Sequence, residues 1–273
     1  MDKSIRHDSL TIFYRDEGSG AVVVLIHGFA EDGAIWDQQT GHLKKNYRLL
    51  IPDLPGSGRS SALPAETTMD KLAEIIKAIL DAEGIGQAIL IGHSMGGYVT
   101  LAFASNYPGR LTAWGLFHST AYADTEEKKA ARQKGIAFIR NNGSAPFIKQ
   151  SIPNLFAERS RTTHAATIAD LISRYGEFDP DSLIYYYRAM IGRPDRTDTL
   201  KKTRVPVLFI IGQQDPTIPL PLSLQQTHLP EQAHVHILAN AGHMGMLEEP
   251  SASNAILEKF LGSLQPGQET VSR

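Results

Sequence analysis

Short apolar runs of strand length alternate with helical patterns along most of this chain. The alternation restricts the possible folds strongly, because strands separated by helices form a mostly parallel sheet with helices on both faces. The runs are rich in Val, Ile and Leu, as is typical of strands buried on both sides. Two earlier segments, Leu10–Tyr14 and Ser4–His7, predict an antiparallel edge. The predicted parallel strands are Val22–Ile26, Tyr47–Ile51, Ala88–Ile91, Leu111–Phe117, Val207–Ile211 and Val235–Leu238.

Helices are predicted where apolar residues recur at helical spacing between these runs. Thr68 is placed to cap Met69–Glu83, and Gly84 ends that pattern. Gly96–Tyr107 and Ser251–Leu264 are the other helices predicted between or after the strands. The last residues, Gln265–Arg273, are predicted to form a frayed tail.

Between residues 122 and 200 the alternation stops, and we find no convincing strand there. Helices are predicted over 126–140, at Pro146, over 161–175 and over 180–191, with Thr125 or Asp124 capping the first and Asp179 the last. A helical block inserted between two strands should cover the carboxyl edge of the sheet, where open α/β sheets bind ligands. The sequence therefore predicts a core made of residues 1–120 and 201–273, and a helical cap over 121–200.

Composition removes several classes of protein. The 273 residues contain no cysteine, which excludes a disulfide scaffold, a thiolate metal site and a cysteine nucleophile. With 27 basic and 29 acidic residues, the net charge of −2 does not favour nucleic acid as a partner. Ala21–Ile26 is far shorter than the ~20 apolar residues of a membrane span, and Met1–Leu10 is polar. We expect a soluble, cytoplasmic protein without a membrane partner; its oligomeric state stays open.

One motif carries chemistry by itself. Gly92-His93-Ser94-Met95-Gly96 matches G-x-S-x-G, and it stands between a predicted strand and a predicted helix. Small residues at this turn let strand and helix pass closely while the serine is held on a strained backbone. Ser94 is therefore the candidate nucleophile. His93 is expected on the packing side of the turn.

A serine nucleophile needs a base, and the base needs an orienting acid. Asp215 follows the strand predicted over 207–211, and His243 follows the next strand. Both therefore reach the sheet edge at which Ser94 emerges, and they complete a predicted triad in the order Ser, Asp, His. The oxyanion hole is expected from the backbone N–H groups of Met95 and Phe29, the latter in the loop after Val22–Ile26.

These motifs resemble those of the α/β-hydrolase superfamily over nearly the whole chain. The resemblance implies an α/β-hydrolase fold with a Ser94 nucleophile, a His243 base, an Asp215 acid, and the Phe29 and Met95 amides as oxyanion donors. It is nearest to the serine-nucleophile branch of carboxylesterases, enol-lactonases and C–C bond hydrolases with a helical cap. The motifs that carry it are His27-Gly28-Phe29, Asp53-Leu54-Pro55-Gly56-Ser57-Gly58-Arg59-Ser60, Gly92-His93-Ser94-Met95-Gly96-Gly97, Gly212-Gln213-Gln214-Asp215 and Gly242-His243.

Departures from relatives disfavour other chemistries of this fold. Haloalkane dehalogenases and epoxide hydrolases have Asp where this chain has Ser94. Plant-type hydroxynitrile lyases usually have Lys where Met244 stands, and the menaquinone-pathway synthases have Arg where Tyr98 stands. The leading hypothesis is thus a hydrolase of a small or medium carboxylic ester that works through an acyl-enzyme. The alternatives are a lactone or C–C bond hydrolase of a catabolic pathway, and a ligand sensor that keeps the triad.

The substrate pocket is predicted beneath the cap. His118, at the end of a predicted strand, is expected to line it, and a role as a rival base is the alternative. From the cap and the His243 loop we expect Tyr186, Met190 and Met246. No cofactor is expected. His234 and His236 share one strand face without a third ligand, so no metal site is predicted either. Basic residues slightly outnumber acidic ones over 122–200, too slightly to predict an anionic substrate.

Overall fold

In the computed structural model, residues 1–264 are described; the tail predicted for Gln265–Arg273 lies outside them. They form a single eight-stranded sheet in the order β1-β2-β4-β3-β5-β6-β7-β8. The first two strands pair antiparallel to their neighbours and all later pairs are parallel, which confirms the predicted fold class. The strands are β1 (Asp2–His7), β2 (Leu10–Glu17), β3 (Ala21–Ile26), β4 (Tyr47–Pro52), β5 (Ala88–His93), β6 (Leu111–Phe117), β7 (Val207–Gly212) and β8 (Ala233–Leu238).

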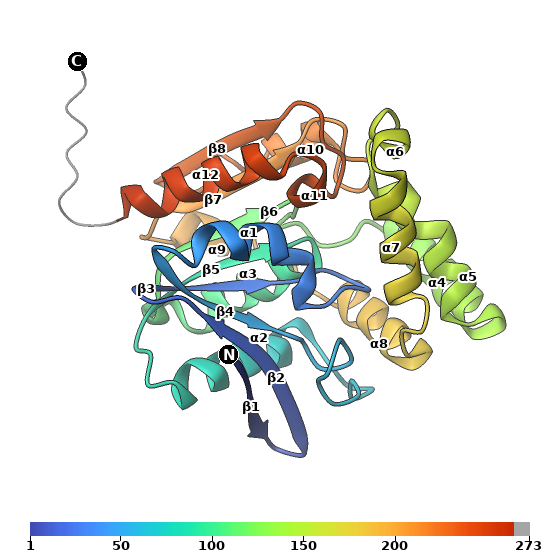
Figure 1. Cartoon of the computed structure of the whole chain (residues 1–273), viewed down its shortest axis with the longest axis horizontal. Coiled ribbons are helices and arrows are strands. Elements are labelled where there is room, and N and C mark those ends of the chain that lie inside the picture. The colour runs from blue at the N-terminus through green and yellow to red at the C-terminus, as the bar shows by residue number, and fades with distance from the viewer. Residues whose placement is uncertain (265–273) are drawn as a thin grey trace.

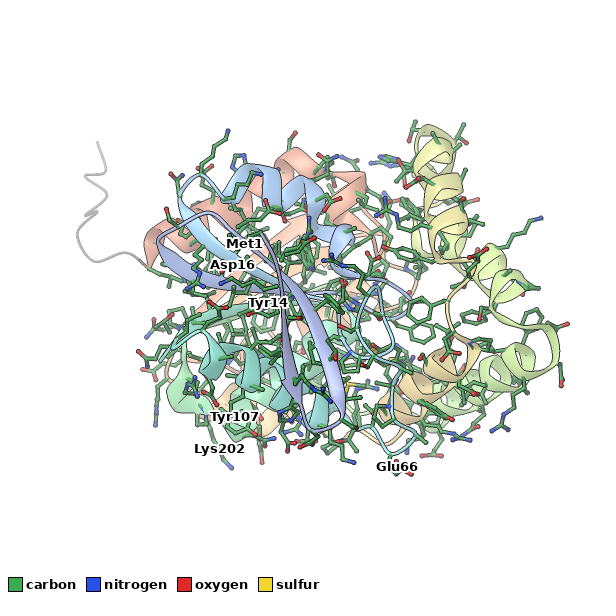
Figure 2. The ribbon with its side chains drawn as sticks, turned by 60° about the horizontal axis from the view of Figure 1, so that its bottom comes forward. Met1, Tyr14, Asp16, Glu66, Tyr107 and Lys202 are labelled. Atoms are coloured by element: carbon green, nitrogen blue, oxygen red, sulfur yellow. The ribbon has the colours of Figure 1, made fainter. Side chains whose placement is uncertain are left out.

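Helices cover both faces of the sheet, and each face has its own apolar core. On one face, side chains of α2 (Met69–Ala82), α3 (Met95–Asn106) and α9 (Thr197–Lys202) pack on the strands. On the other face, the 3-10 turn η1 (Gly33–Trp36), α1 (Asp37–Leu43) and α12 (Pro250–Ser263) do so. Trp36 and Trp114 are fully buried. The β1–β2 hairpin closes one side of the sheet, and Figure 2 labels Met1 and Asp16 where the two strand ends meet.

The segment between β6 and β7 is helical and contains no strand among the described residues. Figure 1 shows α4 to α8 gathered at one end of the molecule, beside the sheet. Thr125 caps the first of these helices and Asp179 caps α8, each through its side chain. The helices of this segment before α9 are α4 (Glu126–Asn142), α5 (Ser144–Ser151), the 3-10 turn η3 (Ile152–Leu155), α6 (Ser160–Thr163), α7 (Ala165–Tyr175) and α8 (Pro180–Ile191).

Several boundaries differ from the predicted ones. The helix predicted over 161–175 is divided at His164, whose ring Nδ1 lies 3.0 Å from the carbonyl oxygen of Ser160. The second helix begins two residues before Pro146, so the proline lies inside its first turn, where a missing N–H costs little. Short elements lacking a long apolar repeat escaped prediction: η1, α1, η2 (Pro108–Arg110), α10 (Leu220–Leu224) and α11 (Gly245–Glu248).

Candidate active site

Ser94 lies on the sharp turn that joins β5 to α3. Its backbone angles, φ 50° and ψ −112°, lie outside the regions that side-chain-bearing residues prefer. Neighbouring glycines make the turn possible. A Cβ on Gly92 would lie 2.2 Å from the carbonyl oxygen of Gly96, and one on Gly96 would lie 2.4 Å from that of Ile26. The turn therefore presents Ser94 at the carboxyl edge of the sheet.

His243 and Asp215 meet Ser94 at this edge. The Nε2 atom of His243 lies 2.8 Å from Oγ of Ser94, and its Nδ1 atom lies 2.7 Å from Oδ2 of Asp215. Burial alone would raise the pKa of Asp215, but the adjacent His243 ring holds that pKa below its ordinary value. The carboxylate thus accepts a hydrogen bond from Nδ1–H of His243, which leaves Nε2 free to accept a proton from the serine hydroxyl.

The other carboxylate oxygen of Asp215 is fixed by the backbone. Its Oδ1 atom accepts hydrogen bonds from the amides of Thr217 (2.7 Å) and Ile218 (2.9 Å). These bonds hold the carboxylate plane, and through it the orientation of the His243 ring. The three side chains come from loops after β5, β7 and β8, so their meeting is a property of the parallel sheet.

The loop after β3 carries Phe29, whose backbone amide is one of the two predicted oxyanion donors. Phe29 follows Gly28 there and borders the same cavity as Ser94. Met95 is the first residue of α3, so its amide belongs to the helix turn whose N–H groups have no partner within the helix. The two amides remain the candidates for an oxyanion hole.

A cavity of about 210 Å³ lies over Ser94 and His243, between the sheet edge and the inserted helices. It is smaller than the ~300–1,000 Å³ of sites that hold drug-sized ligands, so it fits a small molecule. Its walls are mostly apolar and aromatic. Among them are Phe29, Phe147, Leu171, Tyr175, Tyr187 and Met190.

Comparison with known proteins fits this geometry. A family model described as the alpha/beta hydrolase family matches residues 23–255. The chain belongs to the alpha/beta hydrolase family. A thermophilic esterase of Thermogutta terrifontis, solved with malate bound, is similar to this hydrolase at 28% identity and a TM-score of 0.91, covering 97% of this chain and 99% of its own.

Two curated relatives of this hydrolase have different activities. It is 29% identical to the dihydrolipoyllysine-residue acetyltransferase component of an acetoin cleaving system of Cupriavidus necator, over 93% of this chain and 67% of that protein. It is 25% identical to a 2-hydroxy-6-oxononadienedioate/2-hydroxy-6-oxononatrienedioate hydrolase of Paraburkholderia phymatum, over 93% of this chain and 91% of that protein. Membership of the family therefore does not determine which reaction this hydrolase catalyses.

Three of the four predicted pocket residues of the hydrolase lie elsewhere. Met190 borders the cavity as expected. Tyr186 is fully buried, and its hydroxyl donates a hydrogen bond to the carbonyl of Pro55. The next residue, Tyr187, lines the cavity instead. Met246 is buried in the apolar core, and its carbonyl accepts a hydrogen bond from Gln39.

His118, which the sequence predicts to line the pocket, is also buried away from the cavity. Its Nδ1 atom accepts a hydrogen bond from the amide of Gly212 (2.9 Å), and its Nε2 atom lies 3.2 Å from the amide nitrogen of Gly245. Burial lowers the pKa of His118 well below its ordinary value, so the ring is neutral. The ring of His118 therefore lies between the end of β7 and the first residue of α11, and it does not border the cavity.

A buried ion pair that the sequence did not reveal lies beside the hydrogen-bonded residues Ser94, His243 and Asp215. Oε2 of Glu31 is 3.0 Å from Nδ1 of His93 and accepts a hydrogen bond from the amide of Gly28 (2.6 Å). Nε2 of His93 lies 2.9 Å from the carbonyl oxygen of His243. Burial would lower the pKa of His93, but the Glu31 carboxylate raises it above its ordinary value. The pair joins the Phe29 loop to the His243 loop.

Glu248 is a second buried carboxylate that the sequence did not reveal. Oε1 accepts hydrogen bonds from the amides on either side of His243, those of Gly242 (2.9 Å) and Met244 (3.1 Å). Oε2 accepts from the amide of Ala157 (2.9 Å) and the hydroxyl of Ser160, both in the inserted segment. One side chain thus fastens the His243 loop to the helices above it.

Two further properties concern the described residues alone. Within residues 1–264, no three His, Cys, Asp or Glu side chains lie together so that they could hold a metal ion. None of the helices in that range combines the length and the apolar character needed to cross a membrane.

Proposed function

We propose that this hydrolase cleaves a small or medium carboxylic ester through an acyl-enzyme on Ser94. The observation that carries the proposal is the unbroken hydrogen-bonded chain from Oγ of Ser94 through His243 to Asp215, at the floor of a small cavity. In this proposal residues 121–200 act as a cap that closes the cavity over the acyl substrate.

Each residue of the chain has one task in the proposed reaction. His243 takes the hydroxyl proton while Oγ of Ser94 attacks the ester carbonyl, and the amides of Phe29 and Met95 stabilise the oxyanion. His243 then gives the proton to the departing alcohol. A water molecule, activated by the same ring, releases the acid and restores Ser94. Asp215 keeps the imidazole in the tautomer that these steps need.

The similar proteins support an acyl or carbon–carbon bond as the target. The Thermogutta terrifontis protein is an esterase, which favours the ester. The Paraburkholderia phymatum relative hydrolyses a dienedioate, which favours C–C bond cleavage as the second candidate. Small size and largely apolar walls of the cavity fit a short acyl chain better than a long lipid.

The test is hydrolysis of p-nitrophenyl acetate and butyrate by the wild type, Ser94→Ala and His243→Ala. We expect each substitution to lower kcat/KM by about 10⁴-fold or more with the folded state intact by circular dichroism. Ser105→Ala, which changes an exposed serine of the same helix, is the matched control and should keep full activity.

Labelling separates an enzyme from a sensor that merely retains the triad. A serine-directed phosphonate should add one adduct to the wild type and none to Ser94→Ala, as read by mass spectrometry. Wild-type protein that folds but neither turns over an ester nor accepts the label would overturn the proposal. Cleavage of a vinylogous 1,5-diketone with no ester turnover would move the assignment to C–C hydrolysis.

A further inference from the structure

The cavity over Ser94 is lined by a positively charged side chain that the proposed ester chemistry does not use. Arg132 projects from α4 and borders the cavity, with only 13% of its side chain exposed. A guanidinium keeps its charge under all ordinary conditions, and burying it is costly unless acceptors and an opposite charge are present.

Arg132 shares its only acidic partner among the described residues with a second arginine. Its Nε atom donates to Oδ2 of Asp124 (2.6 Å), while Nη2 makes only a long contact with Oδ1 (3.4 Å). Arg193 lies 3.0 Å from the same Oδ1. One buried carboxylate thus faces two guanidiniums, and the cluster carries a net positive charge.

Arg193 is already satisfied by the protein. Its Nη1 atom donates to the carbonyl of Met190 (2.8 Å), and Nη2 donates to that of Tyr122 (3.0 Å). The guanidinium also lies 3.8 Å from the ring centre of Tyr98. Arg132, in contrast, has no carbonyl acceptor among the described residues, so the uncompensated charge lies on the side of the cluster that borders the cavity.

The surroundings would strengthen an electrostatic contact at Arg132. Its guanidinium lies 5.6 Å from the ring centre of Tyr187, which stacks on Phe29 at 4.4 Å. Aromatic walls exclude water, and attraction between opposite charges grows as water is removed. Glu31 is the acidic side chain among the described lining residues, and it is engaged by His93. Among the described lining residues, Arg132 is thus a cation that no lining carboxylate pairs with.

We infer that Arg132 binds a carboxylate of the substrate, so that the enzyme selects an ester carrying a second, ionised carboxyl group. The inference rests on the proposed function and names its substrate class. A guanidinium presents two parallel N–H groups that match the two oxygens of a carboxylate, and such charge-assisted bonds are among the strong ones. A neutral substrate of the same shape would leave the Arg132 donors without a partner.

Two pairs of esters test the inference, each differing in charge and hardly in shape. Monoethyl succinate against ethyl succinamate places the carboxylate on the acyl side. 4-Acetoxybenzoate against 4-acetoxybenzamide places it on the leaving group. The wild type should prefer the anionic member of at least one pair by roughly 10- to 100-fold in kcat/KM, as expected for a charge-assisted hydrogen bond.

Variants assign that preference to Arg132. Arg132→Met should bring the ratio close to one while the neutral ester is still cleaved, and Arg132→Lys should keep part of the preference because it keeps the charge. Arg188→Gln, which removes an exposed arginine from α8, is the matched control and should keep the wild-type ratio. Since each ratio is measured on one preparation, partial unfolding of a variant does not change it.

The outcomes divide cleanly. Equal cleavage of both members of both pairs by the wild type overturns the inference but leaves the esterase proposal standing. A preference that survives in Arg132→Met assigns carboxylate binding to another group and also overturns it. If the wild type cleaves none of the four esters and the phosphonate leaves Ser94 unlabelled, the proposed function is wrong and the inference falls with it.

Discussion

Each ring nitrogen of His93 faces an oxygen atom. The carbonyl oxygen of His243 can only accept a hydrogen bond, and the same holds for the carboxylate of Glu31 when it is ionised. Nδ1 faces the Glu31 carboxylate and Nε2 faces the carbonyl of His243. The ring can donate to both only as an imidazolium. The stabilisation that the charged His93 ring provides is fully present below the pKa of an unfolded histidine. It is lost as the pH rises through the raised pKa of His93 in the folded state.

Glu31→Gln should therefore lower the free energy of unfolding by about 2–4 kcal/mol, because His93 loses the charge that keeps it protonated. A buried neutral His93 would also make the loss larger between pH 7 and pH 5.5, since the unfolded chain then binds a proton that the folded one refuses. Urea unfolding at several pH values measures this. Glu66→Gln, an exposed change labelled in Figure 2, should shift the curve by less than about 0.5 kcal/mol.

Among the elements, the link between the His243 loop and the inserted helices depends on Glu248. Its two oxygens accept four hydrogen bonds, two from each side. A glutamine has one acceptor oxygen, and its NH₂ group would face N–H donors. Such a mismatch is more damaging than the loss of a single exposed ion pair.

We expect Glu248→Gln to lower kcat on a small ester by roughly 10- to 100-fold, with a smaller effect on KM, because the His243 ring is displaced while most of the cavity wall keeps its place. Hydrogen exchange should speed up at the amides of both Ala157 and Gly242. The exposed Glu258→Gln on α12 is the control. Faster exchange on one side alone would show that Glu248 does not join the two elements.

For the whole molecule, an ion cluster at the β1–β2 edge contributes to the response to acid. Lys3 and Arg48 both pair with Asp16, at 2.7 and 2.8 Å, and both pair with Glu83 as well. Figure 2 shows Asp16 and Tyr14 on the same strand, and the Tyr14 hydroxyl donates to Glu83. The hydrogen bond from Arg48 lowers the pKa of Asp16 to about 2 against the effect of burial.

A carboxyl group whose pKa is lower in the folded state stabilises the fold at pH values above its pKa in the unfolded chain. That stabilisation is lost as the pH falls through the pKa of the folded state. Between pH 4 and pH 2, protonation of Asp16 should lower the free energy of unfolding by about 1–2 kcal/mol, after solvent screening is allowed for. Arg48→Met should remove most of this slope in acid unfolding curves. Arg204→Met, which breaks an exposed pair with Glu231, should leave the slope unchanged.

The sequence predicted the sheet and the meeting of Ser94, Asp215 and His243 because both depend on local patterns. Parallel strands end at one edge, so residues just after them must meet. Tyr186 and Tyr187 could not be told apart in this way, since the rotation of α8 is set by packing and by the bond from Tyr186 to Pro55. Glu31 and Glu248 bind backbone amides, and backbone partners leave no trace in side-chain motifs.

Arg132 shows a different limit. Counting charges over 122–200 finds only a slight basic excess, which predicts nothing about the substrate. The position of each charge matters, because most of these charged residues are exposed, while Arg132 borders the cavity and shares its one carboxylate partner with Arg193. A sequence count gives every charge the same weight, and the structure does not.

The backbone amide of His243 donates to the carbonyl of Leu155 (2.7 Å), next to the stretch that Glu248 holds. Leu155 belongs to the helical insert by sequence, but its carbonyl is bonded to the loop that carries His243. Grafting the insert of another hydrolase at its sequence boundaries would therefore replace a backbone partner of His243, the proposed general base. A successful exchange would splice on both sides of residues 155–160, keep that stretch native, and replace only the helices before and after it.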